Sequence, residues 1–232
     1  MRVSVAVILA SLLFAAGAFA KSEDREVPAF NSVHVSAGIR AIIELGPRKP
    51  VHLEADADVL DRLELVVEDG TLKVGFKRNS WREGWPGDTG EIRVAIQTPE
   101  LRSVGASGGA YVKAALTRSD ETEVDASGGS EVHLSGVDAR RLELHGSGGG
   151  VLDVAGRADE LDLQLSGGTV LKGGALEVRD VRVMGSGGSV ASLRATGQLR
   201  GSLSGGSELR CSGGRASNVR VRTSGGSSVD CG

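Results

Sequence analysis

The sequence lacks a basic run and, after its first twenty residues, any long apolar run. The formal net charge is −3 at pH 7, so the chain lacks the positive stripe that marks a nucleic-acid-binding protein. A membrane-spanning helix needs about 20 successive apolar residues, and no segment after Ala20 reaches that length. We therefore expect no nucleic-acid partner and no membrane span after signal cleavage.

The first twenty residues have the three parts of a secretory signal peptide. Arg2 precedes an apolar run over 3–14, and Ala18-Phe19-Ala20 forms an A-x-A cleavage site. The next residue is Lys21 rather than a cysteine, so a lipid-anchored N-terminus is not expected. The sequence predicts a signal peptide over 1–20, cleavage after Ala20, and an exported protein that is periplasmic or at the cell surface.

Aromatic residues are scarce, at 3% of the chain, whereas glycine provides 35 of the 232 residues. The glycines have no G-X-Y period, and valine and leucine lie between them, which excludes collagen and is unlike a disordered segment. They gather in seven evenly spaced Ser-Gly-Gly triplets, with an eighth at Ser212 out of phase. The seven begin at Ser107, Ser127, Ser147, Ser166, Ser186, Ser204 and Ser224. A fixed period of about 20 residues indicates a repeat protein.

Apolar and polar residues alternate on both sides of each triplet. The fifth residue counted from each serine is apolar in all seven copies: Val112, Val132, Leu152, Leu171, Ala191, Leu209 and Val229. The sixth is mostly charged or polar, as at Lys113 and Asp153, and a second alternating segment, such as 161–165, leads into each corner. Alternation of period two indicates strands with one buried face. Each coil therefore holds at least two strands.

These patterns predict an all-β fold, a right-handed parallel β-helix (solenoid) with coils of about 20 residues and Ser-Gly-Gly corners. One such coil cannot bury its apolar face alone and must stack on its neighbours, which places equivalent residues about 4.8 Å apart. We interpret the triplets as corners of the fold rather than a ligand site, because a sharp turn needs positive φ angles that glycine adopts at low cost.

Residues 21–100 are less regular than the rest. Short alternating segments such as 33–35 and 63–67 are separated by turn signals such as Gly46-Pro47 and Asp69-Gly70. We expect irregular N-terminal coils and the cap of the solenoid over 21–100 and regular repeats over 101–232, in one continuous domain, 25–232. The sequence shows no cap at the other end, where the strand edges of 229–231 would invite pairing. A homo-oligomer through the solenoid ends is expected.

Several of these segments together resemble a known family, the putative auto-transporter adhesin head GIN domain. The resemblance rests on the opening 25–30, the strand around Ile43, the segments 55–58 and 69–74, and the phased Ser-Gly-Gly corners. It covers nearly all of the mature chain and implies a parallel β-helix in an exported bacterial protein. It implies no catalytic residues. The two cysteines and the tryptophan-bearing insertion depart from the family pattern.

We identify no catalytic residues, metal ligands or cofactor, and the sequence predicts that the protein is not an enzyme. Gly105-Ala-Ser107-Gly-Gly109 matches the nucleophile elbow G-x-S-x-G, but that motif needs a strand-to-helix turn, and here it is one corner among seven. The four histidines show no pair at metal-ligand spacing. The calcium-binding nonapeptide repeat requires an aspartate that these copies lack.

Two pairs of residues are candidates for special roles. Cys211 and Cys231 are one period apart, so stacking would bring them within disulfide distance; the alternative is two buried thiols. Trp81 and Trp85 lie in a polar, glycine-rich insertion, where exposed rings would bind a ligand. The alternative is that both rings cover the first coils.

Three functions are consistent with these features. The preferred one is an exported, non-enzymatic envelope or surface protein that works in adhesion or assembly, with an unknown protein or glycan as partner. The alternative is a periplasmic glycan- or protein-binding module that uses Trp81 and Trp85. A carbohydrate-active enzyme is the third, and it would need a cluster of acids on one outer face.

Overall fold

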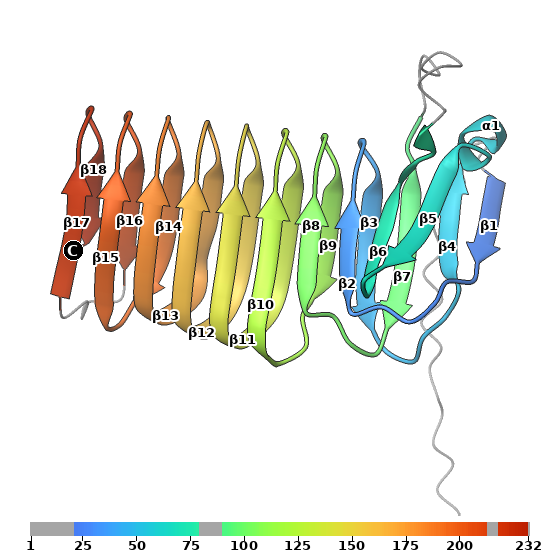
Figure 1. The fold of residues 1–232 in the computed structure, drawn as a ribbon, viewed down its shortest axis with the longest axis horizontal. Coiled ribbons are helices and arrows are strands. Elements are labelled where there is room, and N and C mark those ends of the chain that lie inside the picture. The colour runs from blue at the N-terminus through green and yellow to red at the C-terminus, as the bar shows by residue number, and fades with distance from the viewer. Residues whose placement is uncertain (1–20, 79–89, 213–217, 232) are drawn as a thin grey trace, which may run out of the picture.

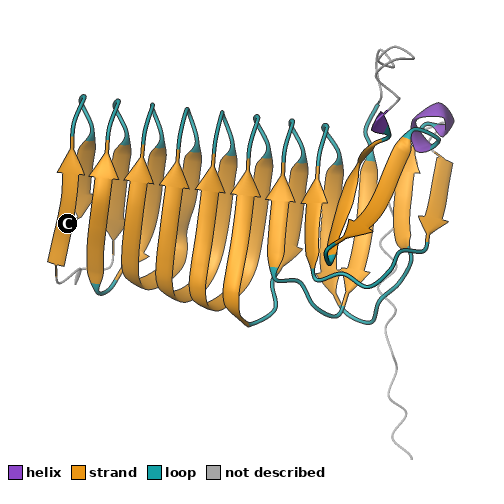
Figure 2. Ribbon diagram, viewed as in Figure 1, coloured by secondary structure: helices purple, strands orange, loops and turns teal. Residues whose placement is uncertain are grey.

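The computed structural model describes residues 21–78, 90–212 and 218–231, and strands make up most of them (Figures 1 and 2). The strands are β1 Lys21–Arg25, β2 Ser32–Val35, β3 Arg40–Leu45, β4 Val51–Ala55, β5 Leu63–Glu68, β6 Thr71–Phe76, β7 Arg93–Thr98, β8 Ser103–Ala106, β9 Tyr111–Ala115, β10 Ser119–Ala126, β11 Glu131–Gly146, β12 Val151–Leu165, β13 Val170–Gly185, β14 Val190–Ala195, β15 Gln198–Leu203, β16 Glu208–Ser212, β17 Asn218–Thr223 and β18 Ser228–Cys231. The one α-helix among these residues is α1, Ala57–Leu60.

Parallel pairing builds two sheets that run the length of the molecule. The front sheet, which faces the viewer in Figure 1, contains β6, β2, β8, β10, the second halves of β11, β12 and β13, β15 and β17. The back sheet contains β7, β3, β9, the first halves of β11 to β13, β14, β16 and β18. Coils lie about 20 residues apart, which confirms the predicted all-β solenoid.

The core lies between the two sheets and is made of the alternating apolar residues. Val132, Leu152 and Leu209 are fully buried on the back sheet, as are Leu142 and Leu144 on the front sheet. Stacked coils therefore share one continuous apolar core, which no single coil could form.

The Ser-Gly-Gly corners form a stack along one edge, drawn as teal loops in Figure 2. In a representative corner, Gly128 and Gly129 have φ angles of 60° and 78°, which glycine adopts without the Cβ clash of other residues. Beneath the corners, buried hydroxyls are satisfied by hydrogen bonds: Ser130 Oγ donates to Ala106 O at 3.0 Å and Ser207 Oγ to Ser204 O at 2.8 Å.

The corner stack continues to a triplet that the sequence pattern did not reveal. Ser36-Ala37-Gly38 stacks on the corner at Ser107, with Ala37 N donating to Ser107 O at 3.2 Å and Gly38 N to Gly108 O at 2.9 Å. Ala37 has a φ angle of 61°, a conformation that costs a residue with a Cβ about 1–2 kcal/mol. Because alanine replaces the first glycine of the triplet, the Ser-Gly-Gly pattern does not identify this corner.

Differences in coil length are absorbed at the edge opposite the corners. The register of β12 shifts against β11 between Leu134 and Val137, and the register of β14 shifts against β13 between Gly173 and Glu177. Extra residues form bulges there, so triplets spaced 18 to 20 residues apart still stack in line.

The N-terminal region does not follow chain order in space. The β2–β3 rung pairs with β8–β9 on one side and with β6–β7 on the other. Beyond β6–β7, the strands β5, β4 and β1 add antiparallel pairs, and α1 packs beside them with Val59 and Leu60 buried. These elements cover the apolar end of the solenoid (Figure 1).

Two features predicted from the sequence fall outside the described residues: the signal peptide, 1–20, and the tryptophan insertion with Trp81 and Trp85. Over the residues that are described, no helix has the length and apolar character of a membrane span.

Candidate functional site

The outer surface of the front sheet carries side chains in straight columns, because parallel strands pair in register. One column, the acid–base column, contains Glu123, Glu143, Asp162, Arg182, Arg200 and Arg220 on six successive rungs. Each is flanked along its strand by inward-facing neighbours such as Leu142 and Leu144. The acidic residues occupy the first three rungs and the arginines the last three.

A second column lies two residues closer to the corners. This corner-side column contains His34, Gly105, Asp125, His145, Gln164, Met184, Ser202 and Arg222. His34, Asp125, His145, Gln164 and Met184 line a shallow groove of about 690 Å³ together with the corner serines. The groove offers imidazole, carboxylate, amide and hydroxyl groups to a ligand.

His34 leans across the glycine in its column. A Cβ atom on Gly105 would lie 2.3 Å from His34 Nδ1, so only glycine leaves room for the ring. His34 Nε2 is 3.1 Å from Ser107 Oγ, within hydrogen-bond distance. Burial of the ring lowers the pKa of His34, although the nearby Asp125 carboxylate acts in the opposite direction.

The contact between Ser107 and His34 does not form a catalytic triad. A triad needs a carboxylate that hydrogen-bonds the second ring nitrogen and orients the base. In the described part of the chain, Asp125 influences His34 only through space, and Gly105 lies between them in the column. The dyad therefore positions the first corner of the regular stack.

Glu123, Asp125 and His145 could together hold a divalent cation. One ligand atom from each lies within 4.8 Å of the others, and carboxylate oxygen with imidazole nitrogen is a donor set that transition metals accept. All three side chains are at least partly exposed. Sequence reasoning named no metal ligands because these residues lie up to 22 positions apart; the 20-residue period was the signal that could have aligned them.

Arg141 lies among the acidic residues of the neighbouring rungs. Its Nε donates to Glu143 Oε1 at 2.8 Å, and its terminal nitrogens lie 3.9 Å from Glu160 Oε2 and Asp162 Oδ2. One guanidinium thus lies beside three carboxylates on successive rungs.

The edge opposite the corners has a second, highly charged groove of about 1120 Å³. Charges of both signs alternate along it. Arg157 donates two hydrogen bonds to Asp138, at 3.1 and 2.9 Å, and this contact lowers the pKa of the Asp138 carboxyl. The paired charges satisfy one another.

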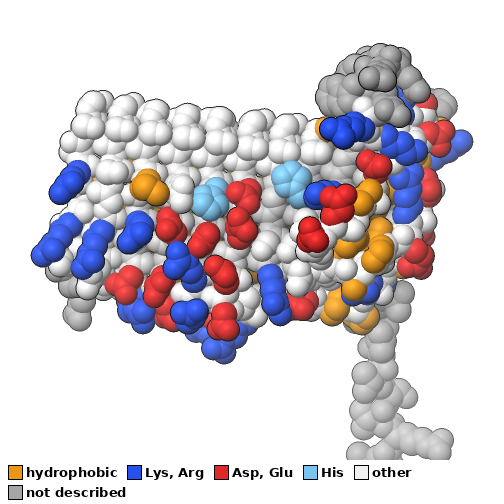
Figure 3. All heavy atoms as spheres, in the orientation of Figure 1, with side chains coloured by type: hydrophobic (Ala, Val, Ile, Leu, Met, Phe, Trp, Pro, Cys, Tyr) orange, Lys and Arg blue, Asp and Glu red, His pale blue; other side chains and the backbone are white. Residues whose placement is uncertain are grey.

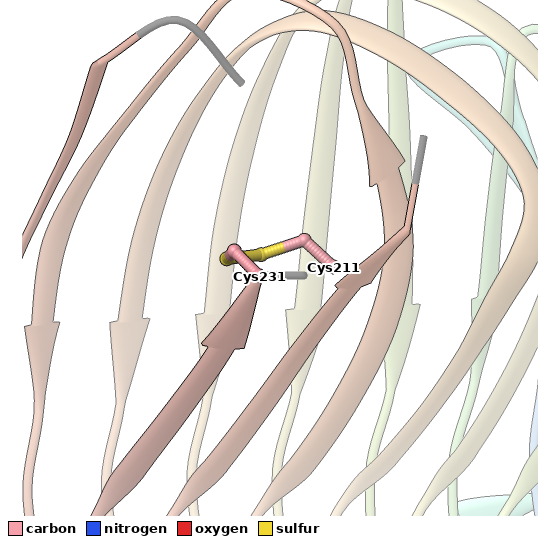
Figure 4. The surroundings of a disulfide bond; sticks show 2 residues. All are labelled: Cys211 and Cys231. Atoms are coloured by element: carbon pink, nitrogen blue, oxygen red, sulfur yellow. A yellow bond between two sulfur atoms is a disulfide. The ribbon is translucent and has the colours of Figure 1, made fainter. Parts of the chain in front are cut away.

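The cysteine pair lies at the C-terminal end of the back sheet (Figure 4). Cys211 and Cys231 are opposite each other in the pairing of β16 with β18, and the structure joins them by a disulfide with a Cα–Cα distance of 4.5 Å. The bond ties the last two back-sheet strands together. Trp81 and Trp85 lie outside the described residues.

The comparisons with known proteins agree with this architecture. The family model of the putative auto-transporter adhesin, head GIN domain, matches residues 29–215. None of the curated proteins matches the chain.

Solved structures share the fold at low sequence identity. A putative adhesin from Bacteroides fragilis is 15% identical with a TM-score of 0.80, over 92% of this chain and 97% of that one. A putative adhesin from Parabacteroides distasonis is 20% identical with a TM-score of 0.64, over 91% and 97%. A putative lipid binding protein from the same organism is 16% identical with a TM-score of 0.67, over 92% and 96%.

Proposed function

We propose, on the premise that this chain belongs to the putative auto-transporter adhesin head GIN domain family, that it is an exported, non-enzymatic envelope or surface protein that works in adhesion or assembly. The observation that carries the proposal is the front sheet. Its inward side chains are packed in the core, whereas its outward side chains stand in columns that are open to solvent. Such a surface binds by repeated contacts along its length.

Three further observations support a binding role. The family model carries an adhesin description. The outward side chains of the front sheet offer charged and hydrogen-bonding groups along its length. The leader over 1–20 has the composition of an export signal.

Export and adhesion can be tested with the full chain, residues 1–232, produced in a Gram-negative host. We expect mass spectrometry to find a mature N-terminus at Lys21 and protease treatment of intact cells to remove the protein. Beads coated with the mature protein should adhere to envelope preparations more than beads coated with an unrelated β-helix. Unprocessed protein in the cytoplasmic fraction, or equal adherence of both bead types, would contradict the proposal.

A periplasmic glycan- or protein-binding module is the second candidate. The groove beside the corner-side column favours it, because His34, His145 and Gln164 offer hydrogen bonds next to the apolar Met184. Binding of the mature protein to a glycan array and to lipid vesicles tests this function, with Trp81→Ala/Trp85→Ala and His145→Ala as variants. Loss of signal in one variant identifies the surface that binds; no signal from any of the proteins contradicts this candidate.

We also propose that the solenoid ends mediate self-association. The strands β17 and β18 form the last rung that the structure describes, and Val219 on β17 is 41% exposed. Unpaired strand edges recruit further strands. Val219→Lys should weaken any oligomer that forms through this end, as measured by light scattering; an unchanged mass would count against it.

A further inference from the structure

The acid–base column changes sign once, at its midpoint. Glu123, Glu143 and Asp162 occupy three successive rungs, and Arg182, Arg200 and Arg220 occupy the next three at the same register position. Figure 3 shows the same division on this face, with acidic side chains in its middle and basic side chains toward the C-terminal end. The front sheet therefore has a charge gradient along the solenoid axis.

Among the described residues, the arginines of this column form no direct ion pair, although Arg200 acts on the Asp180 carboxylate through space. No carboxylate oxygen lies within the 4.0 Å ion-pair limit of Arg182, Arg200 or Arg220 among residues 21–78, 90–212 and 218–231. Other arginines on the molecule, such as Arg157 and Arg210, are held by neighbouring carboxylates. The three arginines stand on strands about 4.8 Å apart, so their like charges repel one another and an acidic counterpart would stabilise them.

A second copy of the front sheet has the right arrangement to supply that counterpart. A two-fold axis parallel to the strands, placed between the rungs of Asp162 and Arg182, reverses the order of the rungs and keeps each column opposite itself. It sets Glu123 against Arg220, Glu143 against Arg200 and Asp162 against Arg182 of the second copy. Every charged pair in the column is then opposite in sign, and the symmetry makes each pair occur twice.

We propose that the front sheet is a self-complementary docking surface for a second copy of this chain in antiparallel orientation. The corner-side column fits the same axis. It sets Asp125 against Arg222 of the second copy, at the outer rungs, and Gln164 against Met184, at the central rungs.

The exposed methionine lies where such an interface needs apolar contact. Met184 is 45% exposed, the most exposed of the three exposed large apolar side chains among the described residues. The two-fold axis passes beside its rung, so the Met184 side chains of both copies are diagonal neighbours across the axis, each facing Gln164 of the other copy, with the charged pairs of the acid–base column beside them. An apolar centre with a polar rim is the usual anatomy of a protein interface.

A third column, two residues farther from the corners than the acid–base column, includes Arg141, Glu160 and Asp180 and contains one unfavourable pair. Glu160 would face Asp180 of the second copy, but each carboxylate has an arginine of its own chain nearby: Arg141 lies 3.9 Å from Glu160, and Arg179 lies 3.1 Å from Asp180. These arginines reduce the repulsion locally. The columns nearer the corners therefore set the orientation.

The dimer should be weak and sensitive to salt. Six rungs span about 24 Å from first to last, so the surface is at the small end for specific protein interfaces. Its charges are exposed, and screening shortens their range from about 30 Å in 0.01 M salt to about 3 Å in 1 M salt. We expect dimers at low ionic strength and monomers in about 1 M salt.

Charge reversal tests the docking geometry by analytical ultracentrifugation of mature protein. Glu123→Lys/Asp125→Lys places like charges opposite each other in a homodimer, and so does Arg220→Glu/Arg222→Glu. Each variant alone should dimerise at least about tenfold more weakly than the wild type. An equimolar mixture of the two should recover dimers, because lysines at 123 and 125 then face glutamates at 220 and 222.

A matched control separates this geometry from a general effect of charge. Lys113→Glu/Arg194→Glu makes the same charge change as the arginine variant, on the outward positions of the back sheet, and should dimerise like the wild type. Circular dichroism confirms that all variants fold. The proposal would be overturned if the wild type stayed monomeric at every concentration in low salt. It would also be overturned if Glu123→Lys/Asp125→Lys dimerised as strongly as the wild type, or if the mixture failed to recover dimers. Pairing through the solenoid ends would leave the Glu123→Lys/Asp125→Lys variant unaffected.

Discussion

The imidazole of His34 occupies the space that a side chain at residue 105 would need. Its Nδ1 lies 2.3 Å from the position of a Cβ on Gly105, and its Nε2 lies 3.1 Å from Ser107 Oγ. The histidine comes from the rung formed by β2, and the glycine from β8, 71 positions later in the chain. This contact joins the N-terminal region to the first coil of the regular repeat.

Gly105→Ala should destabilise the protein by about 1–3 kcal/mol, the usual cost of overpacking a tight contact. The methyl group would push the His34 ring away from Ser107. Chemical denaturation of Gly105→Ala, His34→Ala and the double variant measures the coupling. We expect the double variant to lose less free energy of unfolding than the two single variants lose in sum, because His34→Ala removes the clash. Additive effects would show that the two side chains do not compete for this space.

The two glycines of one corner should respond differently to alanine. Gly187 has a φ angle of 75°, and a Cβ there would lie 2.7 Å from Gly167 O, whereas a Cβ on the adjacent Gly188 would meet nothing within 4 Å. We expect Gly187→Ala to cost about 1–3 kcal/mol, from backbone strain and the clash. Gly188→Ala should be close to neutral. Thermal unfolding of both variants makes the comparison, and equal losses would be inconsistent with this corner geometry.

Removing the bridge between Cys211 and Cys231 should destabilise the C-terminal coils. Closing a loop of 20 residues restricts the unfolded chain by an amount worth about 3 kcal/mol. We expect Cys211→Ser/Cys231→Ser to unfold at lower denaturant concentration than the wild type, and thiol titration of oxidised wild-type protein to find no free thiol. A reductant should lower the stability of the wild type but not that of the double variant. Two free thiols in the purified protein would show that the bridge does not form.

Two histidines should titrate in opposite directions from the unfolded value of about 6.5. The hydrogen bond from His52 to Asp24, at 2.7 Å, raises the pKa of His52, whereas burial lowers the pKa of His34. The His52 contact therefore stabilises the β1–β4 pairing below pH 6.5, and that contribution is lost as the pH rises through the folded pKa. The neutral ring of His34 is favoured above pH 6.5, and its contribution is lost as the pH falls through its folded pKa.

Nuclear magnetic resonance titration of the imidazole signals measures both values. Asp24→Asn should return the pKa of His52 toward its ordinary value and leave that of His34 unchanged, since Asp24 contacts only the first of these rings. The protection factors of the β1 amides, which correct for the intrinsic pH dependence of exchange, should fall above pH 6.5 in the wild type more than in Asp24→Asn. An unshifted His52 in the wild type would contradict the hydrogen bond.

The regular repeat could be predicted from the sequence because its signals are local. Alternation around each triplet places Val132 inside and His133 outside, and the period of about 20 residues aligns Cys211 with Cys231. The same period implies the acid–base column, although the residues between triplets vary in number. Only the bulges near Val137 and Glu177 show that the variation is absorbed away from the corners.

The sequence by itself determined the solenoid, its corners and the inward face of each strand, since these depend on φ preferences and on apolar alternation within about 20 residues. The tertiary structure decided which distant strands became neighbours. Insertion of the β2–β3 rung between β6–β7 and β8–β9 has no local signal, because parallel pairing depends on contacts between segments far apart in the chain. The same holds for His34 over Gly105 and for the groups that surround Asp125: their proximity arises from strand pairing rather than from spacing in the sequence.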